Sequence, residues 1–150
     1  MVKQVRKLKK TTTELWETLK NNKNIEAYIE ENKDELLDMD LHSYLNTLLK
    51  ECPYSKSEIF KNANIQQSYG YHLFAGTKKN PSRNHLLQIA FGMQLDLDKT
   101  QRLLRIAGLS ELHPRSKRDI IIIYCIDNKR TLDECCVMLE QKGCEQIYNI

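Results

Sequence analysis

Glycine and proline are scarce in this chain, with only five and three among its 150 residues. Both residues mark turns, so their scarcity argues against a fold built from many short strands. No alternation of apolar and polar residues is sustained, whereas apolar residues recur at intervals of three or four positions. The sequence therefore predicts an all-α protein.

Long apolar runs are missing as well. The longest run, residues 120–126, is far shorter than the roughly 18 residues that indicate a membrane-spanning helix. The first residues are basic but contain neither an apolar core nor a small-residue cleavage site, so we expect no secretory signal. These absences predict a cytoplasmic protein with no membrane partner.

Patterns that carry catalysis or bind metals are absent too. The chain shows no nucleophile–base pair, no paired catalytic carboxylates and no glycine-rich phosphate loop. Its five cysteines and four histidines are dispersed, and no Cys-x-x-Cys pair occurs, so we expect no zinc site and reduced, mostly buried thiols. The sequence thus predicts no enzyme, no cofactor and no metal.

The charges that are present are segregated along the chain. Residues 1–10 carry five basic side chains and no acid, and they form a basic arm. Residues 24–51 carry eight acids against two lysines, a net charge of −6, whereas residues 52–92 carry five bases against one acid, a net charge of +4. This asymmetry favours a polyanion on one side of the molecule and leaves the other side for a different partner.

Capping residues divide the chain into helices. Thr12 or Thr13 is expected to cap the first helix and Asn24 the second. Further helices are expected at 40–49, 55–63, 64–76 and 84–90, and one capped by Asp96 or Asp98 that stops at Gly108. Pro114 is expected in the first turn of the next helix, and Thr131 is expected to cap the last, which Gly143 ends.

The stretch from Ser55 to Ala90 contains two short helices, a small-residue stop at Gly76, a basic loop with Pro81-Ser82, and a helix of the Leu-Leu-x-Ile-Ala type. This order resembles the Cro/C1-type (XRE-like) helix-turn-helix family of bacterial and phage regulators, over about a third of the chain. The resemblance implies a five-helix, lambda-repressor-like module at 40–108. An N-terminal helical extension at 1–39 and a C-terminal helix pair at 109–150 flank it.

The resemblance also implies a recognition helix that enters the major groove of double-stranded DNA. Its polar face would contact bases or backbone, because glutamine pairs with adenine and serine or tyrosine reaches base edges or phosphates. These candidate residues are Gln66, Gln67, Ser68, Tyr69, Tyr71 and His72. Further candidate DNA-binding residues flank this helix, and most of them are expected to contact phosphates. They are Lys56 before the recognition helix and Lys78, Lys79, Ser82 and Arg83 after it.

Gly70 stands in this helix where the family usually has a buried Ile or Val. Glycine costs a helix interior about 1 kcal/mol relative to alanine. We therefore expect close approach of the backbone, either to the preceding helix or to a ligand. Leu73 and Phe74 are expected in the core.

Two partners besides DNA remain open. The helix with four consecutive isoleucines, 120–123, is expected to be largely buried, under the last helix, the Trp16 helix or a second copy of the chain in a homodimer. The expected recognition helix lacks Arg and Lys and is rich in aromatic residues, which is typical of protein interfaces. The alternative to DNA binding is therefore a protein-interaction adaptor, resembling an antitoxin or a kinase-associated partner.

Overall fold

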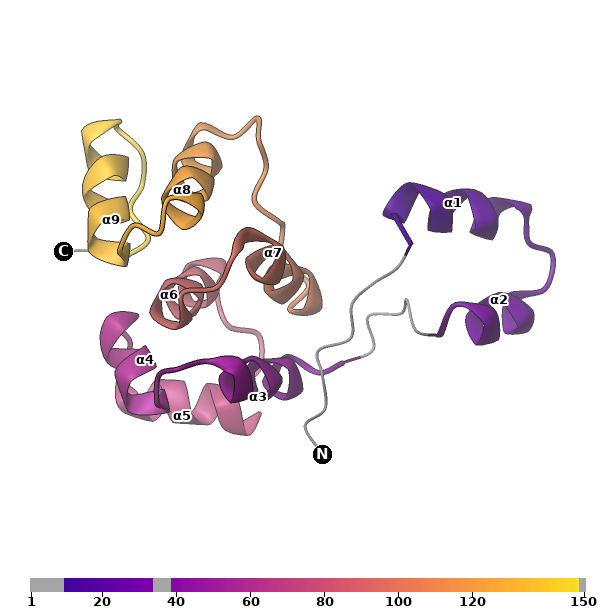
Figure 1. Ribbon diagram of the computed structural model, residues 1–150, viewed down its shortest axis with the longest axis horizontal. Coiled ribbons are helices and arrows are strands. Elements are labelled where there is room, and N and C mark those ends of the chain that lie inside the picture. Colours follow the sequence, from indigo (N-terminus) through magenta and orange to yellow (C-terminus); the bar gives the residue numbers. More distant parts are fainter. Residues whose placement is uncertain (1–9, 34–38, 149–150) are drawn as a thin grey trace. The chain divides into compact units, whose positions relative to one another are not determined.

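The computed structural model describes residues 10–33 and 39–148 (Figure 1). Within these ranges the chain forms nine α-helices and no strand, which confirms the all-α prediction. No helix of the described ranges is long and apolar enough to cross a membrane. The helices fall into two units that divide after Asp38. Most of the predicted basic arm, residues 3–9, lies outside the described residues.

The first unit contains α1 (Thr12–Asn21) and α2 (Ile25–Glu31). Thr11 caps α1, one residue earlier than expected. The Glu14 N–H donates to the Thr11 hydroxyl and the Thr11 N–H donates to the Glu14 carboxylate, which completes a capping box. Asn24 caps α2 as predicted. The two helices contact through Tyr28, which is buried and whose hydroxyl donates to the Leu15 carbonyl.

The second unit begins with five helices that follow the predicted order, with ends that differ from the predicted ones by up to three residues. Helices α4 and α5 contact each other and pack on α6 and α3 respectively, while α7 packs on α3 and α6. Their apolar faces form the main core, in which Tyr44, Ile59, Phe60 and Leu86 have no exposed surface. The five helices are α3 (Leu41–Glu51), α4 (Lys56–Asn62), α5 (Gln67–Ala75), α6 (Arg83–Met93) and α7 (Leu97–Ile106).

Local signals set the ends of these helices. Ser55, Ser82 and Asp96 each accept a bond from the backbone N–H three residues later, which caps α4, α6 and α7. Gly76 ends α5 with φ of 82°, a left-handed conformation that favours glycine. Helix α5 is therefore short, and its end at Gly76 leads directly into the loop at 77–82.

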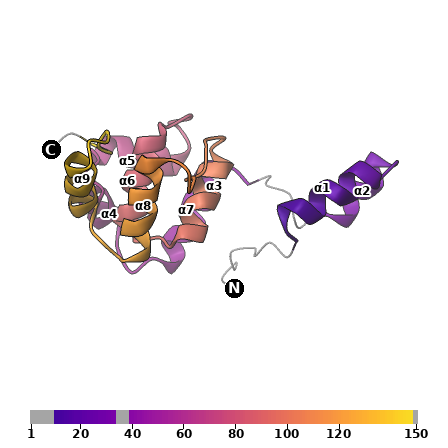
Figure 2. The same ribbon diagram turned by 90° about the horizontal axis from the view of Figure 1, so that it is seen from above.

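The C-terminal pair consists of α8 (Lys117–Asp127) and α9 (Leu132–Gln141). Figure 2 shows α8 between α9 and α7, and α9 also contacts α6. The expectation that Pro114 lies in the first turn of α8 is wrong: Ser116 caps this helix, and Pro114 lies in the turn before it. Proline lacks an N–H, so it also fits the turn that precedes the cap.

The isoleucine run is only partly buried, which corrects the prediction. Ile122 has no exposed surface, but Ile120 is 47% exposed, because successive residues turn by about 100° around the helix. Intramolecular cover comes from α9 and α7, two of the neighbours of α8. The sequence favoured burial on all sides, and the structure leaves one side of α8 uncovered.

We expect Ile122→Asp to destabilise the second unit by about 3 kcal/mol or more, because it places a carboxylate in a packed apolar site. Ile120→Asp is the matched control two residues away, and it should change the free energy of unfolding by no more than about 0.5 kcal/mol. Urea denaturation followed by circular dichroism measures both. Equal stabilities for the two variants would show that α8 is not a packing centre.

Candidate nucleic-acid interface

One face of α5 carries the predicted groove residues. Gln66, Gln67, Ser68 and His72 are exposed, and Tyr71 is 47% exposed. Leu73 and Phe74 on the opposite side are buried, as predicted. The helix thus presents one polar surface to solvent and anchors itself through the other.

Gly70 brings α5 close to α4. A Cβ atom built at this position would lie 2.6 Å from the ring of Phe60, which is fully buried. Of the two explanations that the sequence left open, the preceding helix accounts for the glycine. Helix α5 is consequently packed tightly against α4 through the Phe60 ring.

The side chain of Gln67 is oriented by the neighbouring helix. Its Nε2 donates to the Ser57 carbonyl at 3.2 Å, across the junction between the starts of α4 and α5. This bond uses one N–H of the amide, and the second N–H and the Oε1 acceptor remain for another partner. The amide is therefore presented with a defined direction.

A lysine lies beside the aromatic rings at one edge of this face. The Lys56 ammonium lies 5.9 Å from the Tyr71 ring centroid and 5.8 Å from that of Phe74. Phe60 meets Tyr71 edge-on at 5.2 Å. Lys56 is half-buried in this arrangement, which places a cation beside the exposed Tyr71 ring.

Tyr69 turns away from the others toward α6. Its ring centroid is 4.7 Å from that of His85, and the Lys78 ammonium lies 5.8 Å from the same ring. Burial lowers the pKa of His85 and the charge of Lys78 lowers it further, whereas burial raises the pKa of Tyr69. At neutral pH both rings are uncharged, and the Tyr69 hydroxyl is buried without a hydrogen-bond partner among the described residues.

The loop after α5 carries two exposed lysines. The His72 Nδ1 and the Thr77 hydroxyl lie 2.9 Å apart, and the backbone N–H groups of Thr77 and Lys78 donate to the His72 carbonyl. Lys78 and Lys79 are exposed beyond this turn. Ser82 caps α6 through a 3.1 Å bond from the His85 N–H. The loop therefore places two cations between α5 and the start of α6.

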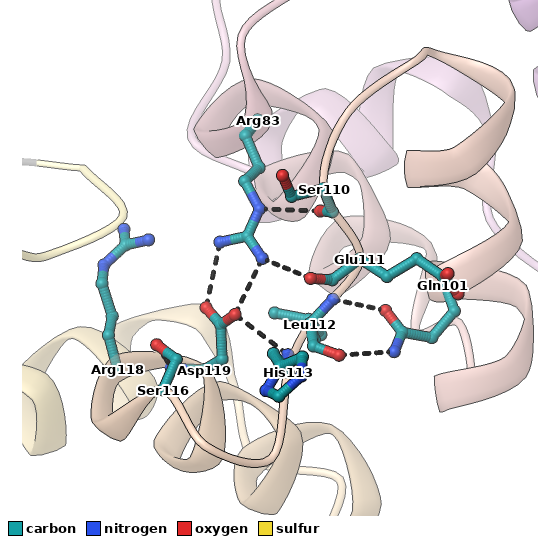
Figure 3. Close-up of a pocket in the computed structure, with 9 residues that line it drawn as sticks. All are labelled: Arg83, Gln101, Ser110, Glu111, Leu112, His113, Ser116, Arg118 and Asp119. Atoms are coloured by element: carbon teal, nitrogen blue, oxygen red, sulfur yellow. Dashed lines mark hydrogen bonds and ion pairs between the residues drawn. The ribbon is translucent and has the colours of Figure 1, made fainter.

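Arg83 has a different role from the predicted phosphate contact. Its guanidinium forms a bidentate pair with the Asp119 carboxylate at 3.0 and 2.9 Å, and Figure 3 shows the pair. The remaining donations go to the carbonyls of Ser110 and Glu111 at 2.9 and 3.0 Å. The guanidinium that the sequence assigns to a phosphate is therefore engaged within the protein, by a carboxylate 36 residues later in the chain.

A network of polar contacts surrounds this pair. Asp119 also accepts the His113 N–H at 3.0 Å, and Gln101 binds both the N–H and the carbonyl of Leu112 at 2.7 and 2.8 Å. Arg118 donates to Asn84 at 2.8 Å. The network fastens the loop between α7 and α8 to the start of α6. Sequence reasoning missed it, since no local spacing identifies partners this far apart.

The Asp119 carboxyl has a lowered pKa. Burial alone raises its pKa, but the Arg83 hydrogen bonds, the His113 N–H and the charges of Arg83 and Arg118 together lower it more. The carboxylate therefore stays ionised throughout the neutral range. This charge is paired and mostly removed from solvent.

Among the described residues, no three His, Cys, Asp or Glu side chains lie close enough together to hold a metal ion. All five cysteines are free thiols. Burial raises the pKa of Cys125, Cys135 and Cys136, so these thiols are protonated at neutral pH.

Comparisons with protein-family models, with curated proteins and with solved structures find no match for this chain.

The ion pair predicts a pH dependence of stability. The folded pKa of Asp119 lies below the unfolded value of about 3.9, so the pair stabilises the fold above that pH and its contribution is lost as the pH falls through the folded pKa. We expect Asp119→Asn to lower the free energy of unfolding by about 2 kcal/mol at neutral pH. The variant should also lose less stability than the wild type between pH 7 and pH 3. Glu111→Gln, at an exposed carboxylate paired with Arg105, should change stability little at either pH. Urea denaturation at pH 7 and pH 3 measures both, and identical acid profiles for wild type and Asp119→Asn would contradict the assignment.

Proposed function

We propose that this chain is a sequence-specific double-stranded DNA-binding protein that inserts α5 into the major groove. The observation that carries the proposal is the exposed polar face of α5, which continues into a loop with two exposed lysines and then into the capped start of α6. A groove-reading helix needs polar side chains at its surface, and phosphates need cations beside it.

The helix order supports a lambda-repressor-like arrangement. Helices α4 and α5 are short, in contact and joined by a tight turn in which Asn64 has a left-handed φ of 54°. The sequence resemblance to the Cro/C1-type regulators covers the same segment. In this proposal the chain acts as a transcriptional regulator in a bacterial or phage-infected cytoplasm.

Gln67 is the proposed base-reading residue. An amide that offers one acceptor and one donor side by side matches the N6 and N7 edge of adenine. The bond from Gln67 to the Ser57 carbonyl fixes the direction of that amide before DNA arrives. Less side-chain freedom is then lost on binding.

Lys78, Lys79 and Ser82 are the proposed phosphate contacts. The two ammonium groups are exposed, and the N-terminus of α6 adjoins them. Lys56 and Tyr71 lie at the other edge of the α5 face and supply a cation and a hydroxyl for the backbone. Tyr69 and Arg83 do not belong to this set, since they pack or pair within the protein.

A second candidate function is a protein-interaction adaptor with little DNA binding. It is favoured by one observation: α5 carries no Arg or Lys, and its exposed Tyr71 packs beside Phe60 and Lys56 as an interface aromatic does.

Titration of a fluorescent random-sequence duplex at low and moderate salt separates the two functions. The DNA proposal expects binding that weakens steeply as salt rises. Absence of binding at low salt would overturn it in favour of the adaptor. Selection from random duplexes then gives the preferred sequence.

Replacing Lys78 and Lys79 with alanine should reduce the slope of log affinity against log salt by about one to two units, because fewer counterions are released. The control is Lys61→Ala with Lys129→Ala, which removes the same charge from two exposed positions outside the α5 face. An unchanged slope in the loop variant would remove the loop from the interface.

Gln67→Ala should lower affinity for the selected sequence by about 1–3 kcal/mol and leave non-specific binding nearly unchanged. Gln141→Ala, an exposed glutamine at the end of α9, is the control. Competition titrations with selected and random duplexes measure the ratio. A parallel fall in both affinities would show that Gln67 does not read a base.

A further inference from the structure

We infer that the exposed side of α8 is a dimerisation surface, on which α8 of a second copy of this chain packs antiparallel about a two-fold axis. The inference goes beyond DNA binding and does not depend on it. It commits to one partner, an identical chain.

One stripe of α8 remains largely exposed in the structure. Ile120 and Tyr124 are 47% and 46% exposed, and Lys117 and Asp127 are exposed at the two ends of the stripe. These four positions are separated by three, four and three residues, which places their side chains on one side of a helix. Ile122, on the opposite side, is fully buried. The stripe is therefore presented by a helix that is anchored from its other side.

The middle of this stripe is a continuous apolar surface. Ile121 and Ile123 flank Ile120 and Tyr124 and are half-buried. Single exposed apolar side chains are common on any protein surface, whereas several adjoining ones mark a contact site. The surface is a candidate for burial by a partner.

The stripe is complementary to itself. The midpoint of α8 is Ile122, and residues at equal distances from it fall into pairs. In antiparallel helices related by a two-fold axis at this midpoint, each residue faces its counterpart in the other copy. An isoleucine then packs against a tyrosine or an isoleucine, and each lysine meets an aspartate. The pairs are Ile121 with Ile123, Ile120 with Tyr124, and Lys117 with Asp127.

The charges at the two ends favour this direction of packing. The Lys117 ammonium donates to the Lys142 carbonyl at 2.8 Å, a neutral acceptor, so the lysine keeps its charge. Asp127 is exposed at the opposite end. Antiparallel packing forms two attractive pairs between the copies, whereas parallel packing would bring lysine against lysine and aspartate against aspartate.

The length of the surface makes the expected dimer weak. Helix α8 is about 16 Å long, so a contact along this helix alone buries less than the roughly 1,200 Å² of a stable interface. We expect a dissociation constant on the order of 10–100 µM. Unfolding experiments at about 1 µM then compare monomers.

Dimerisation through α8 leaves the α5 face open. Figure 1 shows α6 between α8 and α5 in the second unit. None of the proposed DNA contacts belongs to the stripe on α8. The dimer therefore carries two α5 faces, and association and DNA binding can be measured separately.

Sedimentation equilibrium of the full chain at about 5 to 500 µM tests the association. The wild type should shift from monomer to dimer over this range. Ile120→Asp should weaken dimerisation about tenfold or more, because it places a carboxylate in the apolar contact twice per dimer. The control is Ile29→Asp, at an isoleucine of α2 that is also 47% exposed, and it should leave the association unchanged.

Charge reversal at the two ends tests the antiparallel direction. Lys117→Glu and Asp127→Lys should each weaken dimerisation about tenfold, since each variant replaces two attractive pairs by two repulsive ones. An equimolar mixture of the two variants should associate as the wild type does, because the mixed dimer restores both pairs. Both substitutions also suit the helix dipole, so weaker association would not come from unfolding.

The outcomes separate this inference from the DNA proposal. A wild-type chain that stays monomeric over the whole range would overturn the inference, as would association that Ile29→Asp abolishes and Ile120→Asp does not. Charge variants that associate no better in mixture than alone would contradict antiparallel packing. If the chain binds duplex DNA but stays monomeric, only this inference fails, and if it dimerises but binds no duplex, only the DNA proposal fails.

Discussion

The bidentate pair between Arg83 and Asp119 is the contact on which the arrangement of the second unit depends. It joins the first turn of α6 to the first turn of α8, and the same guanidinium holds two carbonyls of the intervening loop. The C-terminal pair is also attached through the Arg118 bond to Asn84 and through contacts of α8 with α7 and of α9 with α6. The pair is only partly exposed, so solvent screens it less than a surface ion pair. It turns two sets of helices into a single unit with a defined surface around the start of α6.

That surface explains how the proposed functional residues are organised. Tight packing of Phe60 against Gly70 sets the distance between α4 and α5, and the Ser57 carbonyl directs the Gln67 amide. Capping at Ser82 ends the lysine-bearing loop and starts α6. Each element is fixed by a contact from its neighbour, so the exposed polar groups are preorganised. This preorganisation suits recognition of a rigid, regularly charged ligand such as duplex DNA.

The sequence predicts much of the fold because its signals are local. Asn24, Ser82, Asp96 and Thr131 cap helices through bonds that span three residues, and such spacing can be read directly. The predicted start of α8 at Pro114 was wrong because the first turn of a helix and the turn before its cap suit proline equally well. The predicted burial of the isoleucine run was wrong in part because composition does not tell which side of a helix lacks a neighbour.

The candidate site was predicted less completely for a related reason. Polar residues of α5 and the loop lysines are exposed as the pattern indicated. Arg83 looked like one more loop cation, and only the folded chain brings Asp119 to it. The sequence places Tyr69 among the groove residues, and in the folded chain its ring contacts that of His85. Long-range pairing decides which polar side chains remain available for a partner, and a single sequence carries no signal for it.

The most direct test of the central claim is a map of backbone amide chemical shifts during titration of the full chain with duplex DNA. We expect the perturbed amides to be concentrated in α5, the loop at 77–82 and the first turn of α6, including Gln67 and Lys79. Perturbations centred on the exposed side of α8, at Ile120 and Tyr124, or no perturbation at low salt, would contradict the claim that the α5 face binds DNA.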